Sequence, residues 1–210
     1  MNFQKALNLF FPIKCGVCGK IGLPICNKCE EIIKKHEINL TNKELFNTNI
    51  EIKKIFIYKY DDIIRDLLIN YKFNDYSYLA DTFAYLIKNN KKMFGILKSY
   101  DIIIPVPLHK KRLLERGYNQ TELIAKKLRI KVETNCLIKI KNIKPQSTKN
   151  AEERKKDIKN TYILKNEEKI KGKKVLLFDD IYTTGSTANE CIKTIIKATN
   201  KIGFLSIAKD

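Results

Sequence analysis

Two adjacent carboxylates and a group of hydroxyls follow the most apolar strand-like stretch of this sequence. Residues 175–178 are Val, Leu, Leu and Phe, and Asp179 and Asp180 come directly after them. Four apolar residues in a row are typical of a strand that is buried on both faces of a parallel sheet. Ligands of open α/β sheets bind beside the carboxyl ends of the strands. We therefore expect the two acids to lie at the edge of a binding site.

The turn after the acids has the composition of a phosphate site. Small residues leave backbone N–H groups accessible, and a helical pattern from about Ala188 places a helix N-terminus beside them. The neighbouring acids suit sugar hydroxyls or a metal ion. A Walker B interpretation of the acids fails because the chain contains no G-x-x-x-x-G-K-[ST] motif. The candidate phosphate ligands are Thr183, Thr184, Gly185, Ser186 and Thr187.

Residues 175–187 resemble the phosphoribosyl-pyrophosphate (PRPP) signature of type I phosphoribosyltransferases. The resemblance implies that Asp179 and Asp180 hold the ribose 2′- and 3′-hydroxyls and that the turn wraps the 5′-phosphate. It also implies Mg²⁺ as a cofactor that binds together with PRPP. If phosphoribosyl transfer occurs, the two acids are the candidate catalytic residues, because they would steady the ribose as charge develops at its anomeric carbon.

Four cysteines near the N-terminus have the spacing of a metal site. They form two C-x-x-C pairs separated by seven residues, namely Cys15, Cys18, Cys26 and Cys29. Four soft ligands in closely spaced pairs suit tetrahedral zinc in a closed, structural site. Two disulfides are disfavoured in a cytoplasmic protein, and the spacing lacks the usual run of an iron–sulfur cluster. We therefore predict a structural Zn²⁺ ion.

Length and composition fit one α/β domain with a small appendage. The chain has 210 residues, of which 44% are hydrophobic, and a formal net charge of +18. No run of about 18 apolar residues occurs, which excludes a membrane-spanning helix, and the N-terminus lacks the features of a signal peptide. The expected location is the cytoplasm, with a peripheral position at the inner membrane left open. The basic charge favours nucleic acid or anionic lipid without specifying either.

The hydrophobic pattern predicts an open, mostly parallel sheet with helices on both faces and a small N-terminal module. The expected domains are a zinc-binding module at residues 1–40 and a phosphoribosyltransferase-like domain at residues 50–210. The polar residues 40–50, rich in Asn and Thr, suggest a linker between them. The predicted strands lie at 50–60, 102–104, 162–164, 175–178 and 203–207, and the predicted helices follow Asp61 and lie at 76–89, 121–128 and 188–201.

A second loop is expected to face the phosphate turn. Three isoleucines at 102–104 predict a buried strand, and the prolines that follow end it. In type I phosphoribosyltransferases, a loop in this place holds the pyrophosphate of PRPP. The candidate contacts are Pro107, Leu108 and His109; for His109 an exposed position in the loop is the open alternative. Residues 139–174 are strongly basic, and we interpret them as a loop that serves as a lid over a polyanionic substrate.

Several segments, taken in order, resemble the ComF family of competence proteins. They are the four-cysteine module, residues 105–108, Arg116-Gly117-Tyr118-Asn119-Gln120, Gln146 with Glu153-Arg154, and residues 175–187. The resemblance implies a role in natural competence, in which the protein handles incoming single-stranded DNA in the cytoplasm beside a helicase-like partner and the uptake channel. The alternative is an active phosphoribosyltransferase that transfers phosphoribose from PRPP to a nucleobase or another amine.

Overall fold

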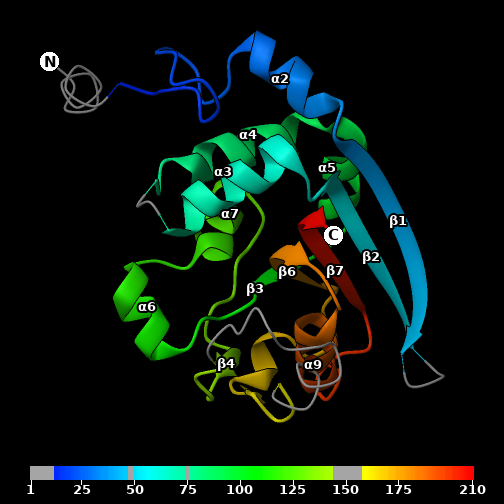
Figure 1. Ribbon diagram of the computed structural model, residues 1–210. Coiled ribbons are helices and arrows are strands. Elements are labelled where there is room, and N and C mark those ends of the chain that lie inside the picture. Colours follow the sequence, from blue (N-terminus) through cyan, green and yellow to red (C-terminus); the bar gives the residue numbers. More distant parts are fainter. Residues whose placement is uncertain (1–11, 47–49, 74–75, 144–157) are drawn as a thin grey trace, which may run out of the picture.

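A computed structural model describes residues 12–46, 50–73, 76–143 and 158–210 (Figure 1). The main sheet consists of β1 (Glu37–Phe46), β2 (Ile50–Lys59), β3 (Ile102–Pro105), β6 (Val175–Tyr182) and β7 (Ile202–Lys209), and β4 (Leu137–Lys139) pairs separately with β5 (Tyr162–Leu164). The helices are α2 (Asn27–Lys34), α3 (Asp62–Phe73), α4 (Leu79–Asn89), α5 (Lys91–Leu97), α6 (Lys110–Arg116), α7 (Gln120–Lys127), α9 (Ser186–Ile195) and the short 3₁₀ helix η1 (Glu167–Lys169). None of these helices in the described residues has the length and apolarity that crossing a membrane requires.

The main sheet is parallel except at one edge. Its strand order is β1-β2-β7-β6-β3, and β1 is the strand that runs antiparallel to its neighbour. Strands β3 and β6 are adjacent and parallel, with Pro105 opposite Phe178. Parallel neighbours end at the same edge of a sheet, so the loop after β3 and the residues after Phe178 leave the sheet side by side.

Both faces of the sheet are covered, and β6 contributes to the core on each side. Leu176 and Phe178 pack in the core that contains α3, α4 and α7, whereas Val175 and Leu177 pack in the core that contains α9. Figure 1 shows these helices on opposite sides of the sheet. The uninterrupted apolar stretch thus follows from burial on both faces, as the sequence predicts. The predicted α/β fold with a mostly parallel sheet is confirmed.

The expected linker at residues 40–50 is wrong over the residues that the structure describes there. Residues 37–46 form β1, which pairs antiparallel with β2 from Glu37 opposite Tyr58 to Phe46 opposite Ile50. This strand lies at the sheet edge and none of its residues is fully buried, so its polar composition is compatible with a strand. A polar edge strand and a polar linker have similar compositions. The composition of residues 40–50 therefore does not distinguish a strand from a linker.

The N-terminal cysteine segment packs on helix α4. The Thr82 hydroxyl donates a hydrogen bond to the Pro24 carbonyl at 2.8 Å, and Gly16 lies so close to Leu79 that an added Cβ would meet its side chain at 2.4 Å. Strand β1 spans the end of the expected module 1–40 and most of the interval before residue 50. The division into two domains stays a prediction.

Candidate functional site

The four N-terminal cysteines converge in space. Their sulfur atoms all lie within 4.8 Å of one another, and the Sγ atoms of Cys18 and Cys26 are 3.7 Å apart. Tetrahedral zinc with Zn–S bonds of about 2.3 Å would place its sulfur ligands about 3.8 Å apart. Cys15 and Cys29 are buried. The cluster could therefore hold a metal ion, and its soft ligands and spacing fit the predicted zinc.

Backbone amides around the cluster favour negative sulfur. Burial raises the pKa of Cys15, but hydrogen bonds from the backbone at Cys18, Cys26 and Val17 outweigh burial and bring it to about 6. The Cys26 amide lies 3.4 Å from the Cys15 sulfur. In contrast, burial and the neighbouring thiols raise the pKa of Cys29. A bound cation would remove this conflict, because it stabilises all four thiolates together.

Strand β6 ends in the predicted acidic pair. Asp179 accepts a hydrogen bond through Oδ1 from the backbone amide of Asp180 at 2.9 Å, and Asp180 Oδ2 lies 2.9 Å from Lys72 Nζ. Burial and the neighbouring Asp180 raise the pKa of Asp179 to about 7, although Lys72 acts in the opposite direction. Within the described residues, each carboxylate keeps one oxygen without a polar partner. Two such oxygens on adjacent residues suit two neighbouring hydroxyls.

The predicted phosphate turn follows directly and leads into α9. Gly185 has a φ of +73°, which favours glycine, and it caps the helix that begins at Ser186. This start is two residues earlier than the predicted Ala188. The five turn residues surround a small hollow of about 40 Å³ together with Asp179 and the start of α9. The Thr184 and Ser186 hydroxyls, both at its edge, lie within hydrogen-bond distance of each other at 2.9 Å. The geometry places hydroxyls and a helix N-terminus around one small space, which suits a phosphate group.

A tyrosine packs against the phosphate turn, and a buried lysine contacts this tyrosine. A Cβ on Gly185 would lie 2.4 Å from the Tyr182 hydroxyl, so this ring occupies the space beside the glycine. The Tyr182 hydroxyl is 3.2 Å from Lys54 Nζ, and Lys54 is only 3% exposed. Lys54 in turn pairs with Glu44 of β1 at 2.5 Å. The antiparallel edge strand is thereby connected to the phosphate turn.

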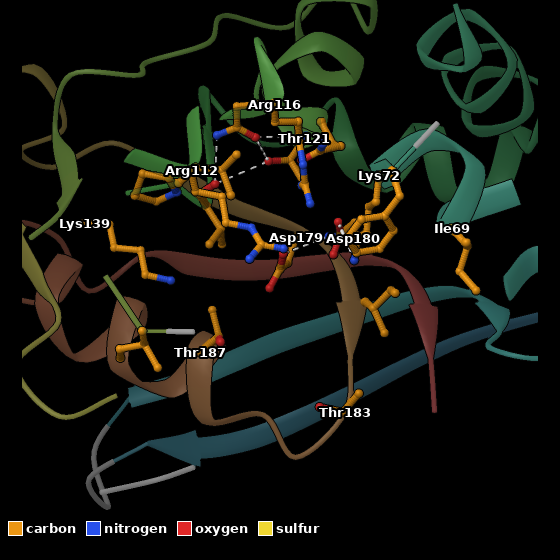
Figure 2. Close-up of a pocket in the computed structure, with 18 of the residues that line it drawn as sticks. Ile69, Lys72, Arg112, Arg116, Thr121, Lys139, Asp179, Asp180, Thr183 and Thr187 are labelled. Carbon is orange, nitrogen blue, oxygen red and sulfur yellow. Dashed lines mark hydrogen bonds and ion pairs between the residues drawn. The ribbon is translucent and has the colours of Figure 1, made fainter. Parts of the chain in front are cut away.

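The acidic pair lines a cavity of about 450 Å³, to which Thr183 and Thr187 of the turn also contribute (Figure 2). Its walls come from α3, the loop after β3, α6, the start of α7, and the β4–β5 pair. Basic side chains surround the two acids in this cavity, as Figure 2 shows for Lys72, Arg112, Arg116 and Lys139. A cavity that combines two carboxylates, several cations and two threonines of a phosphate-type turn can bind a sugar carrying more than one phosphate group.

The loop after β3 reaches this cavity through some of its predicted residues. Pro107 and Leu108 line the cavity. His109 is not among the described residues that line it; its Nδ1 accepts a hydrogen bond from the Lys111 amide at 3.3 Å and caps α6. Residues 144–157 of the expected lid, which include Gln146, Glu153 and Arg154, lie outside the described residues.

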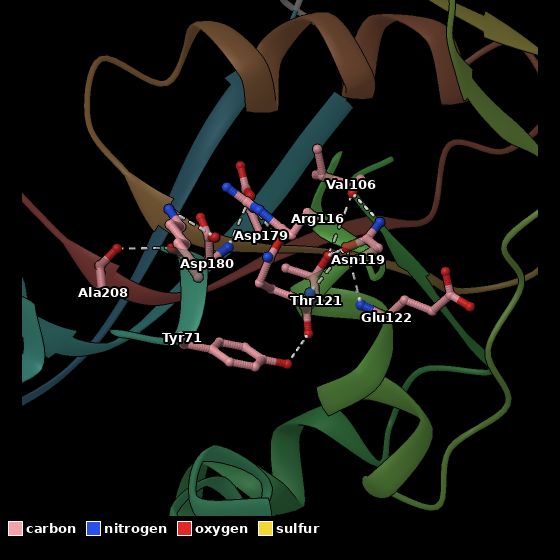
Figure 3. A network of polar contacts seen from close by, with 12 residues as sticks. Tyr71, Val106, Arg116, Asn119, Thr121, Glu122, Asp179, Asp180 and Ala208 are labelled. Carbon is pink, nitrogen blue, oxygen red and sulfur yellow. Dashed lines mark hydrogen bonds and ion pairs between the residues drawn. The ribbon is translucent and has the colours of Figure 1, made fainter. Parts of the chain in front are cut away.

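The start of α7 forms a polar network beside the acids (Figure 3). Asn119 donates to the Val106 carbonyl at 3.0 Å and accepts from the Thr121 amide at 3.1 Å. Arg116 donates a hydrogen bond to Gln120 Oε1 at 2.5 Å. This bond uses the carbonyl oxygen of the Gln120 side chain and not its NH₂ group. Gln120 is only 2% exposed, and its Nε2 has no partner within the described residues. Gln120 is among the residues that line the cavity, so this donor is a candidate contact for an oxygen atom of a ligand.

Sequence reasoning did not identify several residues of the cavity wall. Lys72 lies at the end of α3, where the sequence pattern indicated only an amphipathic helix. Lys139 of β4 lies with its ammonium 5.6 Å from the centre of the Tyr162 ring, and burial lowers its pKa. Nothing in the local sequence distinguishes either lysine from the many others, since only the fold brings them to the acids.

An open, mostly parallel sheet with an acidic pair and a phosphate-type turn at its carboxyl edge defines the chain as a type I phosphoribosyltransferase-like protein by fold. In a comparison with known proteins, the chain is 33% identical over 155 residues to Competence protein F of Haemophilus influenzae, covering 69% of this chain and 67% of that protein. It is 30% identical over 180 residues to Competence protein ComFC of Streptococcus pneumoniae, covering 86% and 76%. The chain belongs to the ComF family.

A shorter match concerns a protein with another name. The chain is 30% identical over 101 residues to the DNA utilization protein YhgH of Escherichia coli, covering 46% of this chain and 44% of that protein. No family model matches the chain.

The cysteine cluster yields a prediction about metal content. We expect the purified protein to contain about one zinc ion per chain and Cys29→Ser to lose most of it, because a serine hydroxyl is a poor replacement for the fourth thiolate. Loss of the ion should also lower the midpoint of thermal unfolding. Elemental analysis without added metal measures the content.

Cys136→Ala is the matched control, since this buried cysteine lies outside the cluster. It should keep the zinc. A folded wild-type protein that contains no metal would contradict the prediction.

The raised pKa of Asp179 predicts how stability depends on pH. Because the pKa rises from 3.8 to about 7 in the folded state, folding takes up a proton between these values. We expect the unfolding free energy of the wild type, relative to Asp179→Asn, to be greatest at low pH. This difference in unfolding free energy between the two proteins should decline as the pH rises through 7, by at most about 1.4 kcal/mol per pH unit.

Urea unfolding of both proteins at a series of pH values measures this difference. Asp66→Asn, on the exposed side of α3, controls for the loss of a carboxylate elsewhere. If the wild-type and Asp179→Asn curves run parallel through this pH window, the assignment of the proton to Asp179 is wrong.

Proposed function

We propose that this protein binds PRPP in the cavity beside Asp179 and Asp180 and acts in natural competence by handling incoming single-stranded DNA in the cytoplasm. The observation that carries the first part is that Asp179, Asp180, Thr183 and Thr187 line one cavity at the carboxyl edge of β6, and that Asp179 and the whole turn surround a small hollow of their own. The competence role rests on similarity to relatives that are named as competence proteins and as a DNA utilization protein.

Each part of PRPP has a chemically suitable counterpart in the cavity. The turn at 183–187 would take the 5′-phosphate through backbone N–H groups and hydroxyls. The unpaired oxygens of Asp179 and Asp180 would accept hydrogen bonds from the two ribose hydroxyls. On the other side of the acids, Arg116 and Gln120 offer donors that suit the oxygens of pyrophosphate. When bound, Mg²⁺ would neutralise part of the pyrophosphate charge.

Transfer of phosphoribose to a nucleobase or another amine is the second candidate function. One observation favours it: the cavity continues past the acids to Tyr60, Ile69 and Phe73, which provides an apolar wall for a further group. The Arg116 guanidinium lies 5.5 Å from the centre of the Phe73 ring. In such a reaction, the two acids would hold the ribose while positive charge develops at its anomeric carbon.

The DNA part of the proposal rests on charge. A net charge of +18 favours sequence-independent contact with phosphates. Partners of the kind that DNA uptake requires, a helicase-like protein and the uptake channel, would deliver or receive the strand. The zinc module would then serve as a structural support or as a contact for DNA.

A ligand titration tests the PRPP site. We expect Asp179→Ala/Asp180→Ala to weaken binding of PRPP in the presence of Mg²⁺ by at least about tenfold, because two charge-assisted hydrogen bonds are lost. Isothermal titration calorimetry measures the dissociation constants, and pyrophosphate release with added nucleobases reports transfer. Asp66→Ala should leave binding unchanged. Equal affinity in the double variant and the wild type would refute the site.

A salt titration tests the DNA part. We expect fluorescently labelled single-stranded DNA to bind at low salt and its affinity to fall linearly with the logarithm of the salt concentration, since phosphate contacts release counterions. Fluorescence anisotropy follows the binding, and a duplex of the same sequence shows whether single strands are preferred. Absence of binding at low salt would rule out direct handling of DNA.

A further inference from the structure

Lys72 lies inside the candidate PRPP cavity and neutralises one of its acids. Its Nζ is 2.9 Å from Asp180 Oδ2, and the two side chains are only 19% and 15% exposed. Figure 2 shows Lys72 and Asp180 facing each other at one side of the cavity, with Ile69 of the same helix nearby. This pair therefore differs from an exposed surface ion pair, which solvent would screen.

The position of Lys72 is fixed by its neighbour in α3. The Tyr71 hydroxyl donates to the Gln120 carbonyl at 2.9 Å, and the Tyr118 hydroxyl donates to the Tyr71 carbonyl at 2.6 Å. Tyr71 is fully buried, and its ring also packs against that of Tyr118 at 5.8 Å between centres. These contacts attach the end of α3 to the start of α7. The packed end of α3 thus holds Lys72 beside the two acids.

An ammonium at this position disfavours a divalent cation. Mg²⁺ binds proteins through one or two carboxylates and keeps several of its water molecules. Asp180 already has a cation on one oxygen, and Asp179 has one oxygen engaged with a backbone amide. A divalent ion on the remaining oxygens would lie close to the lysine and be repelled by it. The acids and Lys72 together therefore do not fit a directly bound Mg²⁺ ion.

We propose that Lys72 takes the place of a divalent cation at Asp180, so that a pentose phosphate binds to this acidic pair without a metal bridge. The proposal rests on the proposed function for the identity of the sugar. Lys72 is then a specificity-determining residue, because its ammonium has three donors and can bind a ligand hydroxyl beside the carboxylate that accepts from it. Mg²⁺ that accompanies PRPP would be held by the pyrophosphate oxygens.

A metal titration without any sugar tests whether Lys72 takes the place of a divalent cation at Asp180. Mn²⁺ shares the oxygen preference of Mg²⁺ and is visible by electron paramagnetic resonance. It is titrated into purified wild type, Asp180→Asn, Lys72→Met and Lys72→Met/Asp180→Asn. We expect only Lys72→Met to gain a site, which the second substitution removes. Lys72→Arg should resemble the wild type because it keeps the charge. A wild-type site that Asp180→Asn abolishes, or no gained site in Lys72→Met, overturns the proposal.

Binding of ribose 5-phosphate, which carries no pyrophosphate, tests whether the sugar binds to the acidic pair without a metal bridge. In buffer stripped of metal and in buffer with Mg²⁺, we expect wild-type dissociation constants within about twofold of each other. Lys72→Met should bind about tenfold more weakly without metal and recover when Mg²⁺ is added, since a charge-assisted contact has been lost. Methionine is a good helix former of similar length, so α3 should be preserved, which circular dichroism verifies.

Lys98→Met at the C-cap of α5 is the matched control, because Lys98 is exposed and lies outside the cavity. It should behave as the wild type in both experiments. Binding of ribose 5-phosphate to the wild type that requires Mg²⁺ overturns the inference about Lys72. If the wild type binds no ribose 5-phosphate under either condition, the proposed PRPP site fails, while the Mn²⁺ titration still decides whether Lys72 excludes a cation.

Discussion

Two neighbouring carboxylates at the end of a buried strand require positive charge close by, and the architecture around β6 meets this requirement. Asp179 and Asp180 follow four fully buried residues, so neither can rely on bulk water alone for stabilisation. The compensating charges come from three separate elements: Lys72 from α3, Lys139 from β4, and the arginines of α6. The packing of these elements around one sheet edge therefore also determines what the cavity can bind.

The part of the site that is local in sequence could be predicted. An apolar strand, two acids, a small-residue turn and a helix start follow each other within residues 175–188, and each has its own sequence signal. The four-cysteine cluster could be predicted for the same reason, because the spacing of its ligands within two short turns constrains their geometry. Even here the boundaries differ slightly: α9 begins at Ser186, since Gly185 adopts the left-handed conformation that ends the turn.

The remaining features depend on contacts between segments that are far apart. Lys72 and Asp180 are more than one hundred positions apart in the sequence, and α3 carries several polar residues among which no pattern marks Lys72. The polar composition of residues 40–46 predicts a linker, because β1 lies at the sheet edge and none of its residues is fully buried. The side-chain NH₂ group of Gln120 has no partner among the described residues, and only the structure reveals this, because it shows Arg116 bonded to the carbonyl oxygen instead.

The connection from Glu44 through Lys54 to Tyr182 has a consequence for how the protein can vary during evolution. Lys54 is almost completely buried, so removing Glu44 would leave a charge without its acidic partner, and removing Lys54 would leave the Tyr182 hydroxyl without this donor. Tyr182 fills the space beside Gly185, which in turn shapes the phosphate turn. These four positions should therefore change together among relatives, although one of them lies on an outer strand far from any ligand.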